Sequence, residues 1–116
     1  MSFKKLGLIE PLLLAVEELG YKEPTTIQNR AIPLVLQKKD IFATAQTGTG
    51  KTAAFSLPML QRFRKNNAQN IKELILSPTR ELAVQIEQDI KNYAKHQKIK
   101  TLLWVSGKDI IHKEKI

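Results

Sequence analysis

One segment of the sequence carries the residue types that a phosphate chain requires. Residues 45–52 read Ala-Gln-Thr-Gly-Thr-Gly-Lys-Thr. Glycines let the backbone turn successive N–H groups toward an anion, and a helix that begins at the end of the segment adds partial positive charge. In the general pattern of this kind, the lysine (here Lys51) reaches the outer phosphates and the hydroxyl of Thr52 ligates Mg²⁺. These residues therefore favour binding of a polyphosphate together with magnesium.

The general pattern begins with glycine, and this chain has Ala45 at that position. Alanine is small enough for this bend, although its presence reduces the number of protein families whose phosphate loop matches the sequence. A glycine-rich turn that merely joins a strand to a helix is the alternative interpretation. Because the remaining fixed positions match and the segment lies between a strand pattern and a helix pattern, we favour phosphate binding.

The loop needs a strand before it and a helix after it, and the apolar pattern supplies both. Three short apolar runs are predicted as strands: Ile41–Ala45, Leu74–Leu76 and Thr101–Val105. They are continuous rather than alternating, as expected of strands buried on both faces. Strand, helix, strand, helix, strand at this spacing predicts an α/β fold with a parallel sheet and flanking helices. Three strands do not complete such a domain, so we expect an unfinished sheet.

Four helices are predicted from apolar residues at helical spacing and from end signals. Pro33 falls inside one of them and is expected to kink or divide it, and Pro58 is expected to kink another. The polar stretch 65–72 is expected to be a surface loop. The predicted helices cover residues 11–19, Thr25 or Thr26 to Lys38, a stretch that begins at Lys51, and a long stretch after Pro78 that includes Tyr93.

Composition limits the class of protein. The chain has 116 residues, 42% hydrophobic and 26% charged, which suits one modest globular domain. Without cysteine it forms neither disulfides nor cysteine zinc sites, in keeping with a reducing compartment. No apolar run approaches the roughly 20 residues of a membrane span, and the first residues lack the apolar region of a secretory signal. We therefore expect a cytoplasmic protein without a membrane partner.

The net charge of +8 suits a polyanionic partner. Residues 1–58 hold seven basic and five acidic side chains, whereas residues 59–116 hold twelve and six. Neutralising phosphates releases counterions, so excess positive charge favours nucleic-acid binding. A solvated surface that keeps a small protein in solution explains the excess equally well, so charge alone does not decide.

Two further segments give a family resemblance when they are considered with the phosphate loop. Residues 20–28 read Gly-Tyr-Lys-Glu-Pro-Thr-Thr-Ile-Gln, with Phe3 seventeen positions before Gly20, and residues 78–83 read Pro-Thr-Arg-Glu-Leu-Ala. In order and spacing these segments resemble the Q motif, the P-loop and motif Ia of the DEAD-box ATP-dependent RNA helicases, in the first of their two RecA-like domains.

The resemblance implies a partial RecA-like P-loop NTPase domain over residues 1–105, followed by an off-pattern tail at 106–116. It also implies that ATP and Mg²⁺ are the cofactors, with Lys51 and Thr52 in catalytic roles and Thr52 on the metal. The implied nucleotide-binding residues are Phe3, Lys22, Gln28, Gln46, Thr47, Gly48, Thr49, Gly50, Lys51, Thr52 and Ala53.

The chemistry of two of these residues agrees with adenine recognition. The amide of Gln28 donates to one adenine edge nitrogen and accepts from the adenine amino group, which guanine does not match. The Phe3 ring offers a face on which a base stacks. Taken alone, Gln28 would be interpreted as an exposed helix residue or a cap contact, and Phe3 as an apolar anchor.

The segment Pro78, Thr79 and Arg80 is implied to contact RNA. Thr79 is suited to cap the following helix, which leaves backbone N–H groups and the Arg80 guanidinium for an RNA phosphate, without reading the base sequence. A plain capped helix, with Arg80 paired to a nearby carboxylate, is the alternative. The lysines at 95, 98 and 100 are interpreted as a solvated face, and His96 and His112 lack partners at metal-ligand spacing.

Hydrolysis of ATP needs carboxylates that hold Mg²⁺ through water and orient the attacking water. In the family these come from an Asp-Glu-Ala-Asp motif at the end of a later strand, whereas the aspartates here are Asp40, Asp89 and Asp109. The second RecA-like domain also lies outside this sequence. We therefore expect a truncated helicase that binds adenine nucleotide without completing catalysis, and whose uncovered sheet edge favours self-association.

Three alternatives stay open at this point. The chain could be another P-loop enzyme, which would not need Gln28 and Phe3. It could be a basic module that binds RNA or protein regardless of nucleotide. It could also be a gene fragment without present activity.

Overall fold

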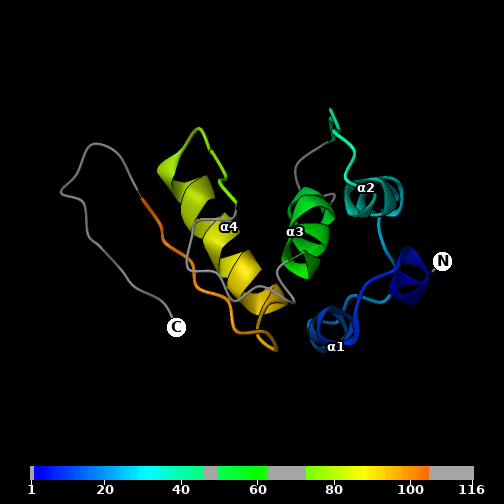
Figure 1. The fold of residues 1–116 in the computed structure, drawn as a ribbon. Helices are drawn as coiled ribbons and strands as arrows, with labels where there is room; N and C mark the ends of the chain where they lie inside the picture. Colours follow the sequence, from blue (N-terminus) through cyan, green and yellow to red (C-terminus); the bar gives the residue numbers. More distant parts are fainter. Residues whose placement is uncertain (1, 46–49, 63–72, 105–116) are drawn as a thin grey trace.

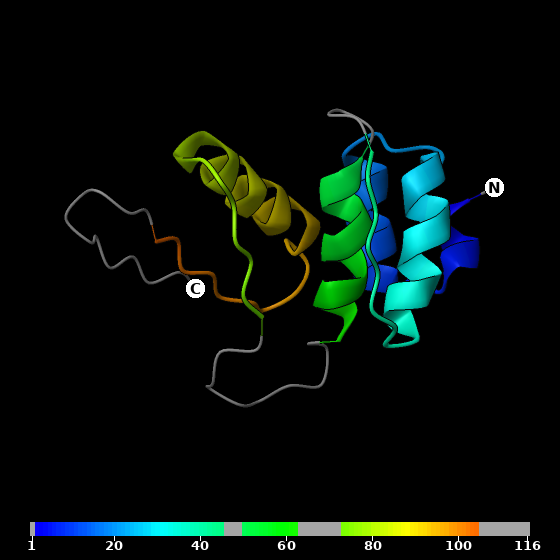
Figure 2. The ribbon, with the colours of Figure 1, turned by 90° about the horizontal axis from the view of Figure 1, so that it is seen from above.

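The computed structural model describes residues 2–45, 50–62 and 73–104. In chain order these residues form a short 3-10 helix, η1 (Phe3–Leu6), and the helices α1 (Glu10–Glu18), α2 (Thr26–Leu36), α3 (Lys51–Gln61) and α4 (Arg80–Tyr93). Helix α3 lies between α4 on one side and α2 on the other, as both ribbon views show (Figures 1 and 2). It packs against both of these helices, while α1 packs against α4 and η1 against α2.

The four predicted helices are confirmed, each with ends that the local sequence explains. Pro11 lies in the first turn of α1, where a backbone N–H would have no acceptor within the helix, so its absence in proline costs no hydrogen bond. The side chains of Thr25 and Thr79 cap α2 and α4 by accepting from backbone N–H groups three residues on. Helix α2 ends two residues before the predicted Lys38, which takes a positive φ of 66° just after the helix.

The two internal prolines do not divide their helices. Pro33 lies inside α2 and Pro58 inside α3, and both helices continue beyond them. A proline removes one donor, while the surrounding turns keep their bonds and, for Pro58, complete burial of the side chain adds packing. A division at Pro33 is therefore not observed, and the expected kinks at Pro33 and Pro58 stay predictions.

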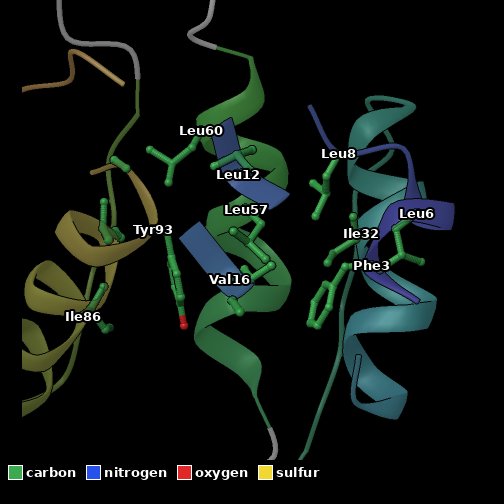
Figure 3. Close-up of a cluster of buried hydrophobic side chains, with 13 residues drawn as sticks. Phe3, Leu6, Leu8, Leu12, Val16, Ile32, Leu57, Leu60, Ile86 and Tyr93 are labelled. Carbon is green, nitrogen blue, oxygen red and sulfur yellow. The ribbon is translucent and has the colours of Figure 1, made fainter. Parts of the chain in front are cut away.

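A single apolar cluster holds these helices together (Figure 3). Leu12 of α1, Ile32 of α2 and Leu57 of α3 are fully buried. Ile86 and Tyr93 bring α4 into the same cluster from the opposite side of α3. Truncating such a leucine to alanine typically costs about 2–5 kcal/mol, so this cluster dominates the stability of the described part of the chain.

The three segments predicted as strands are not strands in the part of the chain that the structure describes. Residues 41–45, 73–77 and 101–104 are irregular, and no backbone hydrogen bond joins one to another. A strand needs a hydrogen-bonded neighbour, so an apolar run without one stays unpaired. Phe42 is 96% exposed and Leu76 is 84% exposed, where burial on both faces was expected. The parallel sheet is therefore not confirmed.

Several predictions fall outside the described residues, namely the loop at 65–72, residues 46–49 of the phosphate loop and the tail at 106–116. Among the described helices, none is long and apolar enough to cross a membrane.

Candidate nucleotide-binding site

The amino end of α3 differs from the amino ends of α2 and α4. Gly50 precedes it with a left-handed backbone (φ 85°, ψ 24°), and no side chain caps the helix. Threonine side chains cap the other two helices. Among the described residues, no side chain accepts from the first N–H groups of α3, and a helix amino terminus of this kind attracts anions.

The side chains of the first turn of α3 suit the same role. Lys51, the first residue of the helix, is exposed, and Thr52 beside it is half-buried. Ala53 is 1% exposed and packs into the core. No acidic residue lies in this turn, so nothing there repels a phosphate.

Gln28 ties the start of α2 to the start of α3. Its Nε2 donates to the backbone oxygen of Gly50 at 3.2 Å, and its Oε1 accepts from the backbone N–H of Thr25 at 2.9 Å. The backbone N–H of Gln28 donates in turn to Thr25 Oγ1 at 3.3 Å, which completes a capping box. With its side chain occupied in this way, Gln28 is only 2% exposed.

The amide of Gln28 therefore makes a cap contact, which is one of the two interpretations that this residue suggests when it is taken alone. The spacing Thr-x-x-Gln is a known signature of a capping box and could have indicated it. An amide oxygen has two lone pairs and an amide nitrogen has two hydrogens, so each atom keeps one free position. Adenine recognition by Gln28 stays a prediction.

Phe3 lies in η1 and is 5% exposed. Its ring centroid is 6.3 Å from that of Tyr21, and the Tyr21 hydroxyl lies 3.1 Å from the Tyr93 hydroxyl of α4. Burial raises the pKa of Tyr93 well above its ordinary value of 10.0, and this hydrogen bond is the second largest cause of the increase. Stacking of Phe3 on a base stays a prediction, and the Lys22 side chain next to this cluster is exposed.

At the amino end of α4, Thr79 Oγ1 accepts from the backbone N–H of Leu82 at 3.1 Å. Ser77 Oγ donates to the Thr79 carbonyl oxygen at 3.3 Å and steadies the approach to the helix. Pro78 and Arg80 are exposed, and none of the ion pairs between described residues includes Arg80. The predicted cap is confirmed, and the alternative in which a local carboxylate occupies Arg80 has no counterpart in the described residues.

A polar contact joins the carboxyl ends of α1 and α4. Glu18 Oε1 lies 2.9 Å from His96 Nε2 and 3.1 Å from Lys95 Nζ. The hydrogen bond from His96, then the one from Lys95, lowers the pKa of Glu18 below its ordinary value of 4.5. Lys95 pairs with Glu18 while its side chain stays 53% exposed, in keeping with the expected solvated face. No group of three potential metal ligands occurs among the described residues, and His112 lies outside them.

Comparisons with known proteins agree with this arrangement. A family model described as DEAD/DEAH box helicase matches residues 25–116. The chain is 47% identical over 109 residues to the DEAD-box ATP-dependent RNA helicase RhpA of Helicobacter pylori, covering 94% of this chain and 22% of that relative. The chain thus spans about a fifth of the relative's length.

Two solved structures are similar in both sequence and shape. RNA helicase Prp28 from Chaetomium thermophilum, bound to ADP, is 41% identical with a TM-score of 0.84, over 93% of this chain and 27% of that one. S. cerevisiae Dbp5, bound to RNA and ADP BeF3, is 38% identical with a TM-score of 0.78, over 94% of this chain and 29% of that one. A family model that matches most of the chain, and agreement in shape at this identity, lead to one conclusion: the chain belongs to the DEAD/DEAH box helicase family.

Proposed function

We propose that this chain is the nucleotide-binding opening part of an ATP-dependent RNA helicase. The observation that carries the proposal is the amino end of α3, where Gly50 is left-handed, no described side chain caps the helix, and Lys51 is exposed. An anion placed there meets backbone N–H groups, the partial charge of the helix and an ammonium group together.

The described residues fit a nucleotide with magnesium. Lys51 neutralises the outer phosphates, and the half-buried hydroxyl of Thr52 is an oxygen ligand of the type that Mg²⁺ prefers. When bound, the ion neutralises charge on the phosphate oxygens. Residues 46–49 complete the loop in this proposal, as the family resemblance implies.

Adenine recognition is assigned to the region around α2 and η1. Gln28 offers its free lone pair and its second amide hydrogen to the base. Stacking on the base is assigned to the Phe3 ring, which is 5% exposed and packs on the more exposed ring of Tyr21. Because Gln28 also holds Gly50, a base that engages this amide acts on the same hydrogen-bonded unit that positions the phosphate end of α3.

RNA binding is assigned to the segment before α4. The Thr79 cap holds the start of the helix, and exposed Arg80 without an ion pair to another described residue is free for a backbone phosphate. A contact of this kind positions a strand without reading its sequence. The related Dbp5 structure, which contains RNA, supports RNA binding in general, and the placement at Pro78, Thr79 and Arg80 is our assignment.

Turnover requires more than this chain brings to the site. The first turn of α3 holds no acidic residue, whereas phosphoryl transfer needs carboxylates around the metal and the attacking water. We assign those groups to the remainder of the helicase, with residues 1–105 as the opening part of its first RecA-like domain and 106–116 as a divergent tail. The purified chain is then expected to bind adenine nucleotide without RNA-stimulated hydrolysis.

Two further assignments complete the proposal. The segments 41–45, 73–77 and 101–104 form a parallel sheet once neighbouring strands are present, and their exposed apolar side chains promote self-association of the isolated chain. A cytoplasmic location is proposed as well, in keeping with a chain that lacks cysteine.

Calorimetric titration with Mg·ATP, Mg·GTP and magnesium tripolyphosphate tests the function. The wild-type chain is expected to prefer ATP to GTP. Lys51→Ala is expected to weaken the binding of all three compounds by about tenfold or more because a charged contact is lost. Lys39→Ala removes another exposed lysine and is the matched control.

Other results would favour other functions. Equal binding of ATP and GTP would indicate a different P-loop enzyme. RNA binding that ignores both nucleotide and Lys51→Ala would indicate a basic binding module. Binding of none of the three phosphate compounds would contradict the proposal outright.

A further inference from the structure

The last residue of α3, Gln61, holds the backbone of the amino-terminal segment. Its Oε1 accepts from the backbone N–H of Ile9 at 2.8 Å, and its Nε2 donates to the Gly7 carbonyl oxygen at 2.9 Å. One side-chain amide thus pairs with a donor and an acceptor of the same three-residue segment, Gly7–Ile9. The two partners lie 52 and 54 positions away from Gln61 in the chain. Both hydrogen bonds are short enough to be well formed.

The link held in this way joins η1 to α1. Gly7 follows η1 with a left-handed φ of 94°, and Ile9 precedes α1 without a side-chain cap. Because the two bonds hold the peptide groups on both sides of Leu8, they fix the orientation of η1 relative to α1. Leu8 and Phe3 both reach the apolar cluster beside Ile32 of α2 (Figure 3).

The two hydrogen bonds of Gln61, called a clasp below, hold the chain directly after η1, which carries Phe3. Phe3 is part of η1 and packs on Tyr21, whose hydroxyl meets Tyr93. At the opposite end of α3, Gly50 is held by Gln28. Helix α3 has 11 residues, a length of about 16 Å at 1.5 Å per residue, so it acts as a rigid spacer between the two clasps.

We propose that Gln61 is a positioning residue for the base of the bound nucleotide, and that it acts by fixing η1, and with it Phe3 and Tyr21, relative to the phosphate end of α3. The inference rests on the proposed function, in which Phe3 and Tyr21 face the adenine. Gln61 touches neither base nor phosphate, so its effect is confined to the part of the affinity that depends on the base.

Comparison of a nucleotide with its bare phosphate chain separates this function from a purely structural one. Mg·ATP and magnesium tripolyphosphate bind the same phosphate site, and only ATP carries a base. A residue that merely stabilises α3 changes both affinities, whereas a residue that positions the base changes only the ATP affinity. The ratio of the two dissociation constants is therefore the decisive readout.

The variant Gln61→Met keeps the length and helix propensity of the side chain and removes both hydrogen bonds. We expect Mg·ATP to bind about fivefold more weakly, because η1 loses its fixed position, while tripolyphosphate binding changes less than about twofold. Gln85→Met makes the same substitution on the exposed face of α4, where the side chain donates to Asp89, and is expected to change neither affinity. Gln61→Glu keeps the acceptor for Ile9 and loses the donor to Gly7, and is the second variant if the methionine variant does not fold.

Each outcome either supports or overturns the function proposed for Gln61. Equal weakening of ATP and tripolyphosphate, or no change in either, would overturn the inference. Phe3→Ala is measured in parallel: a selective loss of ATP affinity in Phe3→Ala without one in the Gln61 variants overturns the function of Gln61 alone. A wild-type chain that binds ATP no better than tripolyphosphate overturns the proposed adenine site itself, and this inference with it.

Discussion

Replacing Gly50 with alanine tests how the start of α3 is held against α2. An added Cβ at this position would lie closer to Gln28 Nε2 than the van der Waals contact distance allows. It would also lie 3.0 Å from Thr25 Oγ1 and 3.2 Å from Gln28 Cδ. The residue also has a φ of 85°, where a side chain is strained. The substitution therefore carries a backbone cost and a packing cost at once.

The chain offers a matched control that separates these two costs. Gly20 has the same φ of 85°, but a Cβ there would meet nothing within 4 Å. Gly20→Ala is thus expected to cost only the backbone strain, about 1 kcal/mol. Gly50→Ala adds displacement of the Gln28 amide from Gly50 and Thr25, two hydrogen bonds of about 1 kcal/mol each, for a total of about 3 kcal/mol.

Urea unfolding followed by circular dichroism measures both free energies of unfolding. The same pair is then repeated in a Gln28→Ala background, where the extra cost of Gly50→Ala should largely disappear because the amide that collides with the new Cβ is gone. Equal costs for the two glycine variants in the wild-type background would refute the close packing of Gly50 against Gln28. An extra cost that survives Gln28→Ala would refute its attribution to this amide.

Three further predictions concern other parts of the chain. Thr79→Ala removes the cap of α4 and should lower the free energy of unfolding by about 1 kcal/mol, with Thr79→Ser close to wild type in urea unfolding; no loss in the alanine variant would contradict the cap. Glu18, whose pKa is lowered below its ordinary 4.5, contributes stability that is present above pH 4.5 and lost as the pH falls below it. The thermal midpoint of wild type should therefore fall more steeply on acidification than that of Glu18→Gln, and parallel curves would argue against the contact with His96 and Lys95. The isolated chain should self-associate through its exposed apolar segments, so sedimentation should show concentration-dependent mass, and emission from Trp104, the single tryptophan, should shift to the blue in the associated form. The double variant Phe42→Ser and Leu76→Ser should weaken both effects, and a wild-type chain that is monomeric throughout would contradict them.

The sequence was sufficient to predict the helices because their signals are local. The caps at Thr25 and Thr79 and the apolar spacing from Leu82 to Tyr93 depend on residues within a few turns of one another. The possibility that Pro33 would divide α2 gave too much weight to a single lost hydrogen bond, because the packing of neighbours such as Ile32 holds the helix together.

The strands could not be established from apolar runs alone. Ile75 packs against the core while Leu74 and Leu76 on either side of it are exposed, so the run lies on the helices with one face only. Whether such a run becomes a strand depends on partners far away in the chain, which a local pattern does not contain.

The clasps at the two ends of α3 show the same limitation. Thr25 and Gln28 are three residues apart and their capping box was within reach of sequence reasoning, but the bond from Gln28 to Gly50 spans 22 positions. The pairing of Gln61 with Ile9 spans 52 positions and leaves no periodic signal. Side-chain amides that bind distant backbone groups become visible only once the helices are packed.

The central claim is that the amino end of α3 receives the phosphates of an adenine nucleotide. The most direct measurement is a nuclear magnetic resonance titration of the isotope-labelled chain with Mg·ADP, which follows the backbone amides of Gly50 and Lys51. We expect these amides to show the largest shift changes of the described residues, with saturation that is lost in Lys51→Ala, while the amides around Thr79 stay nearly unchanged. Saturable binding that leaves Gly50 and Lys51 unaffected would contradict the claim.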